Sequence, residues 1–380
     1  MLETRPKPGA KIRVSGGGRC NLLPSEAAVD DFHTGGSRQA MRNVLLSWPL
    51  SDVRAFFEED LGIPLRLEPS GKIFPASEQP QDVVTALLGE LGRVGGTLRT
   101  RSRVGSIRKD GDRFRLRLDD GDPVETDRVV LATGGLSLPK SGSDGGGLAL
   151  ARALGHELAP TFPVLVPLTT GDPAWQSLPG VSVPATLRVR HGEKTIASSS
   201  GSFLFTHRGF SGPVVLDLSR EITRPDTSDL RLEAHWGGEA TDWSALLRRG
   251  GAGTVGGLVR GVLPRRLADL LLSRASATPD HRLAELARAG RAMLERELSA
   301  CPLPVSGDEG YRTAEATGGG IRLQDLHTKT LESRHVPGLY FAGEMIDVDG
   351  RIGGYNFLWA FVSGRRAGKA AGLQASGENG

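Results

Sequence analysis

The sequence reads Gly338-Leu339-Tyr340-Phe341-Ala342-Gly343-Glu344 near its C-terminal end and continues, two residues later, with Asp347-Val348-Asp349-Gly350-Arg351-Ile352-Gly353-Gly354-Tyr355-Asn356. This pattern predicts a buried strand, an acidic turn, a glycine loop and then a helix over residues 357–367. A carboxylate at the end of a buried strand accepts hydrogen bonds from sugar-like hydroxyl groups, and a glycine pair that opens a helix presents N–H groups to an anion. Both features are typical of a dinucleotide site. The alternative interpretation is an ordinary strand, loop and helix with solvated acidic residues.

The composition limits the class of protein. The chain has 380 residues, and its 52 glycines are roughly twice the usual share of about 7%. A net charge of +3, with acidic and basic residues interspersed, favours a solvated surface and argues against a nucleic-acid partner. The two cysteines, Cys20 and Cys301, form no C-x-x-C pair, so neither a disulfide framework nor a metal site is expected. No apolar leader and no apolar run of about 18 residues occurs, which predicts a cytoplasmic protein without a membrane partner.

The first part of the chain alternates between glycine loops, helices and strands. Residues 11–14 are interpreted as a short strand and residues 15–21 as a loop in which three glycines allow close backbone approach. Helical periodicity predicts helices at 41–48, 53–61 and 83–94. Residues 97–132 are predicted to be strands, of which 128–132 form an apolar run typical of a covered parallel strand that ends in Thr133-Gly134-Gly135.

The middle of the chain is predicted to be an inserted domain. Residues 164–240 are interpreted as β-rich, with strands at 203–207 and 214–218, and residues 241–309 as helical. Residues 1–163 and 310–380 are then the two halves of one domain, because strand, glycine turn and helix return after residue 337. No G-x-S-x-G elbow and no G-x-x-x-x-G-K-[ST] phosphate loop occurs, so hydrolase and NTPase functions are not supported.

These segments together carry a resemblance. Four segments resemble, in their order along about residues 1–372, the YhiN-type (BaiN-like) family of NAD(P)- and FAD-dependent oxidoreductases: residues 15–21, residues 132–135, the segment Phe205-Thr206-His207-Arg208-Gly209-Phe210-Ser211-Gly212-Pro213 and the C-terminal stretch. The resemblance implies an α/β fold: a doubly wound FAD-binding domain of the glutathione-reductase type, interrupted by a β-rich and helical insert that roofs the flavin.

The resemblance also implies the function and the site. We expect hydride transfer through FAD between NAD(P)H, as a transient donor, or a substrate, and a small organic acceptor, with reduction of a conjugated C=C bond as one option. By this analogy Glu344 meets the ribityl chain, the turn at 353–356 lies near the flavin ring and Val104 faces the adenine. The implied cofactor-binding residues are Glu3, Ser15, Gly16, Gly17, Gly18, Arg19, Cys20, Asn21, Val104, Ala132, Thr133, Gly134, Gly135, Gly343, Glu344, Asp349, Gly353, Gly354, Tyr355 and Asn356.

The sequence departs from this family at its start. Members begin with a strand, a G-x-G-x-x-G loop and a helix, and the glycines precede the ribose-binding acid by about 20 residues. In this chain that acid is Glu3, which leaves no room for the loop. We therefore expect that the first strand and glycine loop are missing, and that the natural protein carries roughly 30 further residues.

Several other features remain open at this stage. Gly251-Ala252-Gly253-Thr254-Val255-Gly256 matches G-x-G-x-x-G, but no strand precedes it, so an interhelical linker is preferred. The catalytic residues are unknown, with His207 as a weak candidate proton donor. Cys20 is interpreted as a packed residue, and Arg208 and Arg351 as solvated or anion-binding. An inactive remnant that binds no flavin, and a flavin-associated RNA-binding or RNA-modifying protein, are the rival functions.

Overall fold

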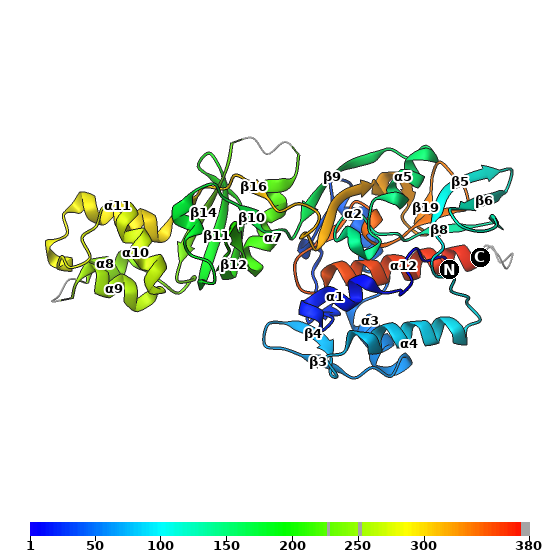
Figure 1. The fold of residues 1–380 in the computed structure, drawn as a ribbon, viewed down its shortest axis with the longest axis horizontal. Coiled ribbons are helices and arrows are strands. Elements are labelled where there is room, and N and C mark those ends of the chain that lie inside the picture. The colour runs from blue at the N-terminus through cyan, green and yellow to red at the C-terminus, as the bar shows by residue number, and fades with distance from the viewer. Residues whose placement is uncertain (226–228, 250–252, 374–380) are drawn as a thin grey trace. The chain divides into compact units, whose positions relative to one another are not determined.

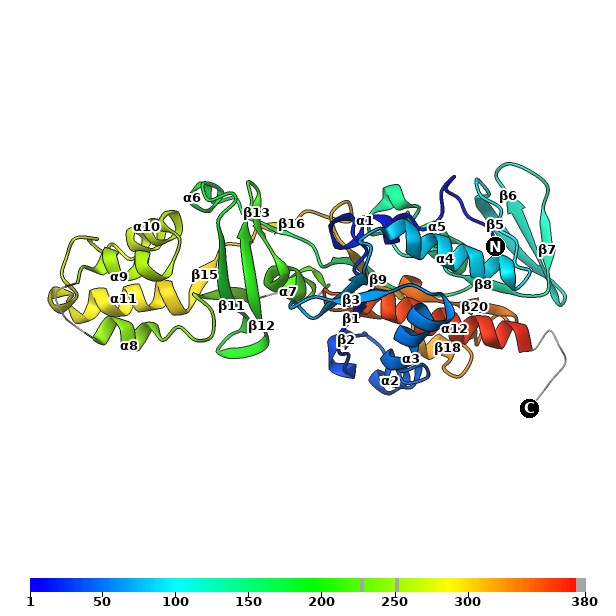
Figure 2. The same cartoon turned by 90° about the horizontal axis from the view of Figure 1, so that it is seen from below.

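The computed structural model describes residues 1–225, 229–249 and 253–373 (Figures 1 and 2). The chain forms two compact units. Unit 1 comprises Met1–Pro163 together with Glu315–Gly380, and unit 2 comprises Val164–Ala314. Among the described residues, no helix combines the length and the apolar character that are needed to cross a membrane.

The central sheet of unit 1 has the strand order β18-β19-β20-β8. Its strands are β18 (Leu326–His327), β19 (Glu332–Ser333), β20 (Leu339–Phe341) and β8 (Val129–Leu131). β20 and β8 run parallel, with Tyr340 opposite Val130, as their apolar runs predict. β8 is the edge strand, and Val130 is 40% exposed although Val129 and Leu131 are buried. One face of β8 is therefore uncovered in unit 1.

Smaller sheets surround this centre. They are the meander β5 (Val104–Asp110), β6 (Arg113–Leu118) and β7 (Val124–Thr126); the sheet of β1 (Leu23–Pro24), β4 (Lys72–Pro75) and β3 (Leu65–Leu67); and the pairs β2 (Phe32–His33) with β21 (Asp349–Gly350) and β17 (Ala316–Ile321) with β9 (Leu158–Val164). Leu2 and Arg99 form an isolated parallel bridge, and the Glu3 N–H donates to the Arg99 carbonyl at 2.9 Å. This bridge sets the position of Glu3.

Helices cover the sheets of unit 1. They are α1 (Ala10–Gly18), α2 (Arg38–Leu45), α3 (Leu50–Ala55), α4 (Pro80–Arg93), α5 (Gly146–Ala153) and α12 (Tyr355–Leu373), with the π-helical turn η2 (Phe56–Asp60) and the 3-10 turns η1 (Val29–Asp31), η3 (Pro139–Ser141), η5 (Leu323–Asp325) and η6 (Gly343–Met345). α12 packs against β20 and β8 and buries Leu358, Trp359 and Val362. The Trp359 indole N–H donates to the Gly343 carbonyl at 3.1 Å, which ties the helix to the end of β20.

Unit 2 contains a seven-stranded sheet with the order β15-β14-β11-β12-β13-β10-β16. The strands are β15 (Cys301–Leu303), β14 (Leu230–Trp236), β11 (Ser182–His191), β12 (Lys194–Phe205), β13 (Gly209–Ser211), β10 (Leu168–Thr169) and β16 (Gly307–Asp308). Along β11, Val183, Ala185, Leu187 and Val189 are buried, an alternation typical of a sheet with one covered face. α7 (Pro213–Thr223) packs against β12 and β11.

The helical part of unit 2 follows β14. It contains α8 (Trp243–Arg248), α9 (Val255–Val262), α10 (Arg265–Arg274), η4 (Leu283–Glu285) and α11 (Arg288–Ser299), while α6 (Pro173–Gln176) precedes the long strands. The Thr254 hydroxyl accepts from Gly257 N–H at 3.1 Å and caps α9. Of the G-x-G-x-x-G match, Gly253 and Thr254 therefore precede α9 while Val255 and Gly256 form its first turn; Gly251 and Ala252 lie outside the described residues.

Two strand predictions are wrong. Residues 11–14 belong to helix α1, whose helical geometry breaks at Ser15, Gly16 and Gly17 and is not resumed at Gly18, which has a φ of +84°. A run of four alternating residues is too short to distinguish the two periods, and packing of α1 against α4 decides the outcome. Residues 214–218 belong to α7, where Pro213 occupies the first turn, a position that favours a helix start.

Candidate functional site

The carboxylate of Glu344 is the centre of a polar network at the end of β20. Its Oε1 accepts hydrogen bonds from the Ser137 hydroxyl at 2.5 Å and from the Thr317 hydroxyl at 2.8 Å. Its Oε2 pairs with Lys11 Nζ, which also donates to Ser137 Oγ at 2.6 Å. The Lys11 and Glu344 side chains are 24% and 16% exposed, so water and salt screen the pair only weakly. The fold thus brings a predicted carboxylate together with three side chains from distant segments.

The glycine turn after β8 lies against this network. Gly134 has a φ of +76°, which favours glycine. A Cβ at Gly135 would lie 2.5 Å from Thr317 Oγ1 and 3.0 Å from Glu344 Oε1. The backbone of the predicted turn Thr133-Gly134-Gly135 therefore lies close to the Glu344 carboxylate, and a residue with a side chain would not fit at position 135.

Sequence reasoning missed three members of the network: Lys11, Ser137 and Thr317. Thr317 begins the run Thr317-Gly318-Gly319-Gly320 in β17, and its hydroxyl accepts the N–H groups of Leu136 at 2.8 Å and Ser137 at 3.0 Å. The glycine run was a usable signal, because Gly319 and Gly320 both have positive φ and contact backbone atoms. Lys11 gave no comparable signal in the sequence.

The glycine loop at residues 15–21 meets the C-terminal glycine pair through β1. A Cβ at Gly354 would lie 2.6–2.9 Å from backbone atoms of Leu23, and a Cβ at Gly16 would lie 2.7 Å from the Asn21 nitrogen. The Asn21 side chain is buried, and its Oδ1 has no hydrogen-bond partner among the described residues. Cys20 is fully buried, and burial raises the pKa of its thiol to about 11. Cys20 is therefore a packed neutral residue, as interpreted from the sequence.

The turn between β21 and α12 is clamped by its own side chains. The Gly350 N–H donates to Asn356 Oδ1 at 2.9 Å, and Asn356 Nδ2 donates back to the Gly350 carbonyl at 3.0 Å. The Tyr355 ring packs edge-on against Phe32 at 5.7 Å. Asp349 is buried within β21. These residues hold the shape of the loop that carries Gly353 and Gly354.

The predicted adenosine side is built on other elements of unit 1. The Glu3 carboxylate accepts from the Arg5 N–H at 2.7 Å, next to the bridge of Leu2 with Arg99. Val104 is the first residue of β5 and is partly buried against the core. Ala132 and Thr133 are exposed at the end of β8, beside the uncovered face of that strand.

The weaker candidates lie elsewhere or have partners of their own. His207 is exposed in the turn between β12 and β13 of unit 2, not within a strand. Arg208 lies 4.0 Å from Glu309, and Arg351 pairs with Asp31 at 3.3 Å. Arg19, in the predicted glycine loop, pairs with Glu68 at 2.7 Å, and its guanidinium group lies over the Phe74 ring of β4.

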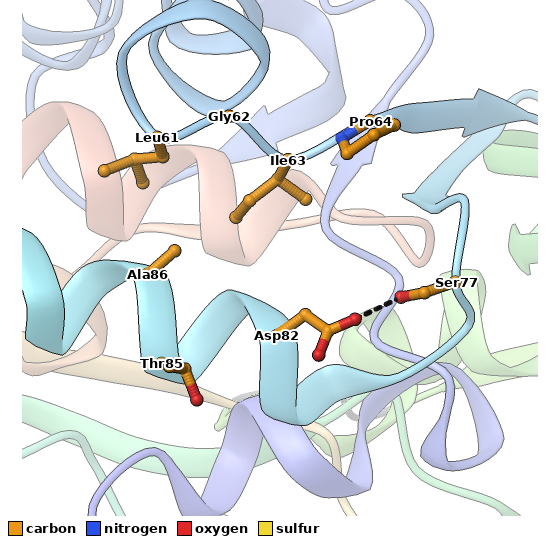
Figure 3. Close-up of a pocket in the computed structure, with 8 residues that line it drawn as sticks. All are labelled: Leu61, Gly62, Ile63, Pro64, Ser77, Asp82, Thr85 and Ala86. Atoms are coloured by element: carbon orange, nitrogen blue, oxygen red, sulfur yellow. Dashed lines mark hydrogen bonds between the residues drawn. The ribbon is translucent and has the colours of Figure 1, made fainter.

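A separate hollow lies at the N-terminal end of α4 (Figure 3). It holds about 410 Å³ and is lined by Leu61, Gly62, Ile63, Pro64, Ser77, Asp82, Thr85 and Ala86. Asp82, in the first turn of α4, accepts a hydrogen bond from the Ser77 hydroxyl at 2.6 Å. None of the predicted cofactor-binding residues lines this hollow, and its contacts are those of a helix start, so the candidate site remains at Glu344.

Comparisons with known proteins agree with the resemblance seen in the sequence. The family described as HI0933-like protein Rossmann domain matches residues 1–370. The 3-dehydro-bile acid delta(4,6)-reductase of Clostridium scindens is 31% identical over 379 residues, covering 98% of this chain and 92% of that protein. The ribosomal RNA dihydrouridine synthase of Escherichia coli is 34% identical over 375 residues, covering 96% and 89%.

Among solved structures, E. coli quinol fumarate reductase aligns with 100% of this chain and 66% of its own, at 15% identity and a TM-score of 0.48. The family match, by contrast, covers the glycine turns, β20 and the turn η6 that carries Glu344. It implies a mixed α/β fold of the Rossmann type and FAD as the cofactor. The resemblance is confirmed, and the chain belongs to the HI0933-like family of flavin-dependent oxidoreductases.

Proposed function

We propose that this chain holds FAD on unit 1, around Glu344, and reduces a carbon–carbon double bond conjugated to a carbonyl group. The observation that carries this proposal is the Glu344 network, in which a shielded carboxylate, a lysine and two hydroxyl groups lie under a glycine backbone. Such a combination suits a polyhydroxylated, phosphorylated ligand better than it suits an apolar one.

The residues present fit FAD on three counts. Gly135 packs against Thr317 and Gly354 packs against Leu23 with no room for a side chain, which fixes the two glycine turns that would lie next to the cofactor. The orphaned Oδ1 of buried Asn21 offers an acceptor that a ligand N–H or hydroxyl would satisfy. The Glu344 carboxylate, held by the Ser137 and Thr317 hydroxyl groups, supplies oxygen atoms that accept hydrogen bonds from ligand hydroxyl groups.

When bound, FAD supplies the hydride-transfer chemistry. The residues of the chain bind and orient: we propose that Glu344 holds a ribityl hydroxyl and that Lys11 fixes the position of the carboxylate. The loop of residues 15–21 and the pair Gly353-Gly354 would line the flavin side, Glu3 the ribose and Val104 the adenine. NAD(P)H is the proposed electron donor.

The pyrophosphate group of FAD needs a binding element of its own, which in folds of this type is a glycine loop that opens a helix. Among the described residues no strand leads into a G-x-G-x-x-G loop and a helix. β8 has an open edge, and Val130 on it and Ala132 just after it are exposed. We propose that β8 receives a further strand, whose glycine loop and helix bind the pyrophosphate and cover Val130.

The names of the two relatives described above indicate the same type of reaction on different substrates. One is a delta(4,6)-reductase of a 3-dehydro-bile acid, and the other a dihydrouridine synthase of ribosomal RNA. Both names describe the reduction of a double bond conjugated to a carbonyl group, in a steroid ring or in uracil. For this chain we propose the same bond type, with a small conjugated enone as the first substrate to test.

RNA is the second candidate substrate, and one observation favours it. Residues 241–300 contain ten arginines, no lysine and six carboxylates. The segment 253–255 after α8 bonds to 281–283 before α11, so Arg248, Arg249, Arg282 and Arg288 belong to one end of the helical part. All four are exposed, a distribution that attracts phosphate groups.

Flavin binding is the first experiment. The chain is purified, its visible spectrum is recorded with and without added FAD, and the cofactor released on denaturation is identified by mass spectrometry. Glu344→Gln should weaken FAD binding about tenfold or more, because a hydrogen bond to a charged group contributes about 1.5–3 kcal/mol. Glu157→Gln, which changes a carboxylate that is 84% exposed, is the matched control and should bind FAD as the parent does.

The visible spectrum distinguishes a chain that binds FAD from one that does not. A yellow protein that NAD(P)H bleaches supports the proposal, whereas a colourless protein that ignores FAD indicates that the strand proposed at β8 is required or that the chain is an inactive remnant. Joining the N-terminal strand, glycine loop and helix of a family member to the chain separates these two possibilities. Activity is then measured on a steroid enone and on ribosomal RNA lacking dihydrouridine; failure on both, in a chain that binds and reduces FAD, would overturn the proposed reaction.

A further inference from the structure

Two histidines and a carboxylate of unit 1 meet beside its central sheet. His156 follows α5, Asp325 ends η5 and His335 lies between β19 and β20. One ring nitrogen of each histidine and one carboxylate oxygen of Asp325 lie within 4.8 Å of one another. The cluster shares no residue with the candidate flavin site.

The contacts within the cluster leave one buried nitrogen without a partner. His335 Nε2 lies 3.6 Å from Asp325 Oδ1, and the two imidazole rings are 5.2 Å apart, edge to face. His156 is only 2% exposed, and its Nε2 lies 2.9 Å from Ser333 Oγ. Its Nδ1 has no hydrogen-bond partner among the described residues. A buried, unsatisfied ring nitrogen beside two further ligand groups requires an explanation.

The backbone holds the ligand-bearing segments in place. Leu326 pairs with Ser333 in the β18–β19 hairpin, and the Arg334 N–H donates to the Asp325 carbonyl at 2.9 Å. The Ser333 hydroxyl accepts the N–H of His335 at 3.0 Å and therefore fixes the start of the loop that carries this histidine. The three groups are thus presented by hydrogen-bonded elements, which is what a metal site requires of its scaffold.

We propose that His156, Asp325 and His335 bind a divalent cation of the zinc type, with solvent in the fourth position. Imidazole nitrogens and a carboxylate oxygen are ligands that Zn²⁺ accepts, and three protein ligands leave one position open. Zinc–ligand bonds of about 2.0–2.1 Å place tetrahedral ligand atoms about 3.4 Å apart. The His335 side chain is 50% exposed and supplies the small movement that closes the set.

Ser333 completes the arrangement as a positioning residue. The Ser333 oxygen accepts the backbone N–H groups of His335 and Val336, so its hydroxyl hydrogen points at His156 Nε2. When His156 binds the metal through Nδ1, Nε2 carries the proton and the Ser333 hydroxyl turns to accept it, which sets the ring orientation. Any proton on the ligating nitrogens is released to solvent as the metal binds. The bound metal would cross-link the end of α5 to the β18–β19 hairpin at the edge of the sheet.

Metal binding is tested on the whole chain after chelation and dialysis. Zn²⁺ is titrated by competition with a chromogenic chelator, and Co²⁺ is added to follow the visible absorption of a low-symmetry site. We expect one tight site per chain and binding to His335→Gln that is weaker by at least about 100-fold, because loss of an outer partner alone costs about 10–100-fold. His327→Gln changes a neighbouring exposed histidine outside the cluster and should bind as the parent does.

Two further measurements exclude a trivial explanation. His335 is half exposed, so circular dichroism of His335→Gln should match the parent and rule out misfolding. Zn²⁺ should raise the unfolding temperature of the parent and of His327→Gln but not that of His335→Gln, and Ser333→Ala should weaken binding about tenfold. Equal zinc affinity in the parent and in His335→Gln, or no site at all at micromolar zinc, would overturn the proposal.

Discussion

The core of unit 2 and the Glu344 region of unit 1 are built in opposite ways. In unit 2, Trp175, Phe203, Phe205, Phe210 and Trp236 are all buried and contact one another, with ring centroids 4.7–6.2 Å apart. Around Glu344, backbone segments approach one another through glycines, and charged or hydroxyl groups fill the space between them. Aromatic packing contributes stability through buried area, whereas the glycine-built region contributes shape and polarity.

This difference predicts which substitutions should change the free energy of unfolding and which should change ligand binding. Substitutions in the aromatic core should change the free energy of unfolding of unit 2 and leave the candidate flavin site intact. Substitutions in the glycine-built region should change ligand binding at a smaller cost in stability. Each unit contains one fully buried cysteine, Cys20 in unit 1 and Cys301 in unit 2, so thiol labelling reports on each unit separately.

The largest effect is expected for Trp236→Ala. Removing a fully buried tryptophan should cost about 3–5 kcal/mol, because the surrounding rings cannot close the cavity. Labelling of Cys301 should become much faster, while Cys20 labelling and FAD affinity stay at the parent values. Ile196→Ala, at an exposed position of the same sheet, is the control. Equal acceleration at both cysteines would show that the two units unfold together.

Gly354→Ala should follow, with a cost of about 2–4 kcal/mol. Its φ is +98°, and the new Cβ would lie 2.6–2.9 Å from backbone atoms of Leu23, so both strain and overpacking act. FAD binding should be lost, and Cys20 should become labelled faster than Cys301. Gly364→Ala on α12, where a Cβ meets nothing within 4 Å, should be neutral or slightly stabilising. Unchanged FAD binding in Gly354→Ala would remove this loop from the proposed site.

Thr317→Val should cost about 2–3 kcal/mol at nearly constant volume. The valine leaves the N–H groups of Leu136 and Ser137 without their acceptor and removes a donor to Glu344. Chemical denaturation and an FAD titration measure the two consequences. Thr317→Ser keeps the hydroxyl and should restore both to nearly the parent values; failure of this rescue would assign the effect to packing.

The smallest effect concerns pH. Burial raises the pKa of Cys20 to about 11 and that of Cys301 to about 12. Both folded-state values lie above those of unfolded thiols, so this contribution to stability is complete below about pH 8.5 and is lost as the pH rises toward 11. Native protein should resist iodoacetamide at pH 8. Cys20→Ala should lose less stability than the parent between pH 9 and 11, and rapid labelling of native Cys20 at pH 8 would contradict the buried thiol.

The sequence predicted those parts of the molecule whose signals are local. The apolar runs of β8 and β20 and the helix after Gly354 were found, because each carries its own periodicity or glycine punctuation. The alternation of residues 11–14 predicted a strand where the structure has a helix. The role of Lys11 was missed because it depends on Glu344, a partner 333 positions away along the chain. His156, Asp325 and His335 are likewise separate in the sequence and meet only through the topology of the sheet.

The hydroxyl of Thr317 gives the Glu344 network a fixed hydrogen-bond direction. Its oxygen already accepts two backbone N–H groups, so its only hydrogen is committed to Glu344 Oε1. Ser137 points a second hydroxyl hydrogen at the same atom, and Lys11 points its protons at Oε2. Both carboxylate oxygens of Glu344 therefore act only as hydrogen-bond acceptors in this network. A ligand group that joins it must bring a hydrogen of its own, which admits alcohols and excludes bare carbonyl and phosphate oxygens from this corner of the site.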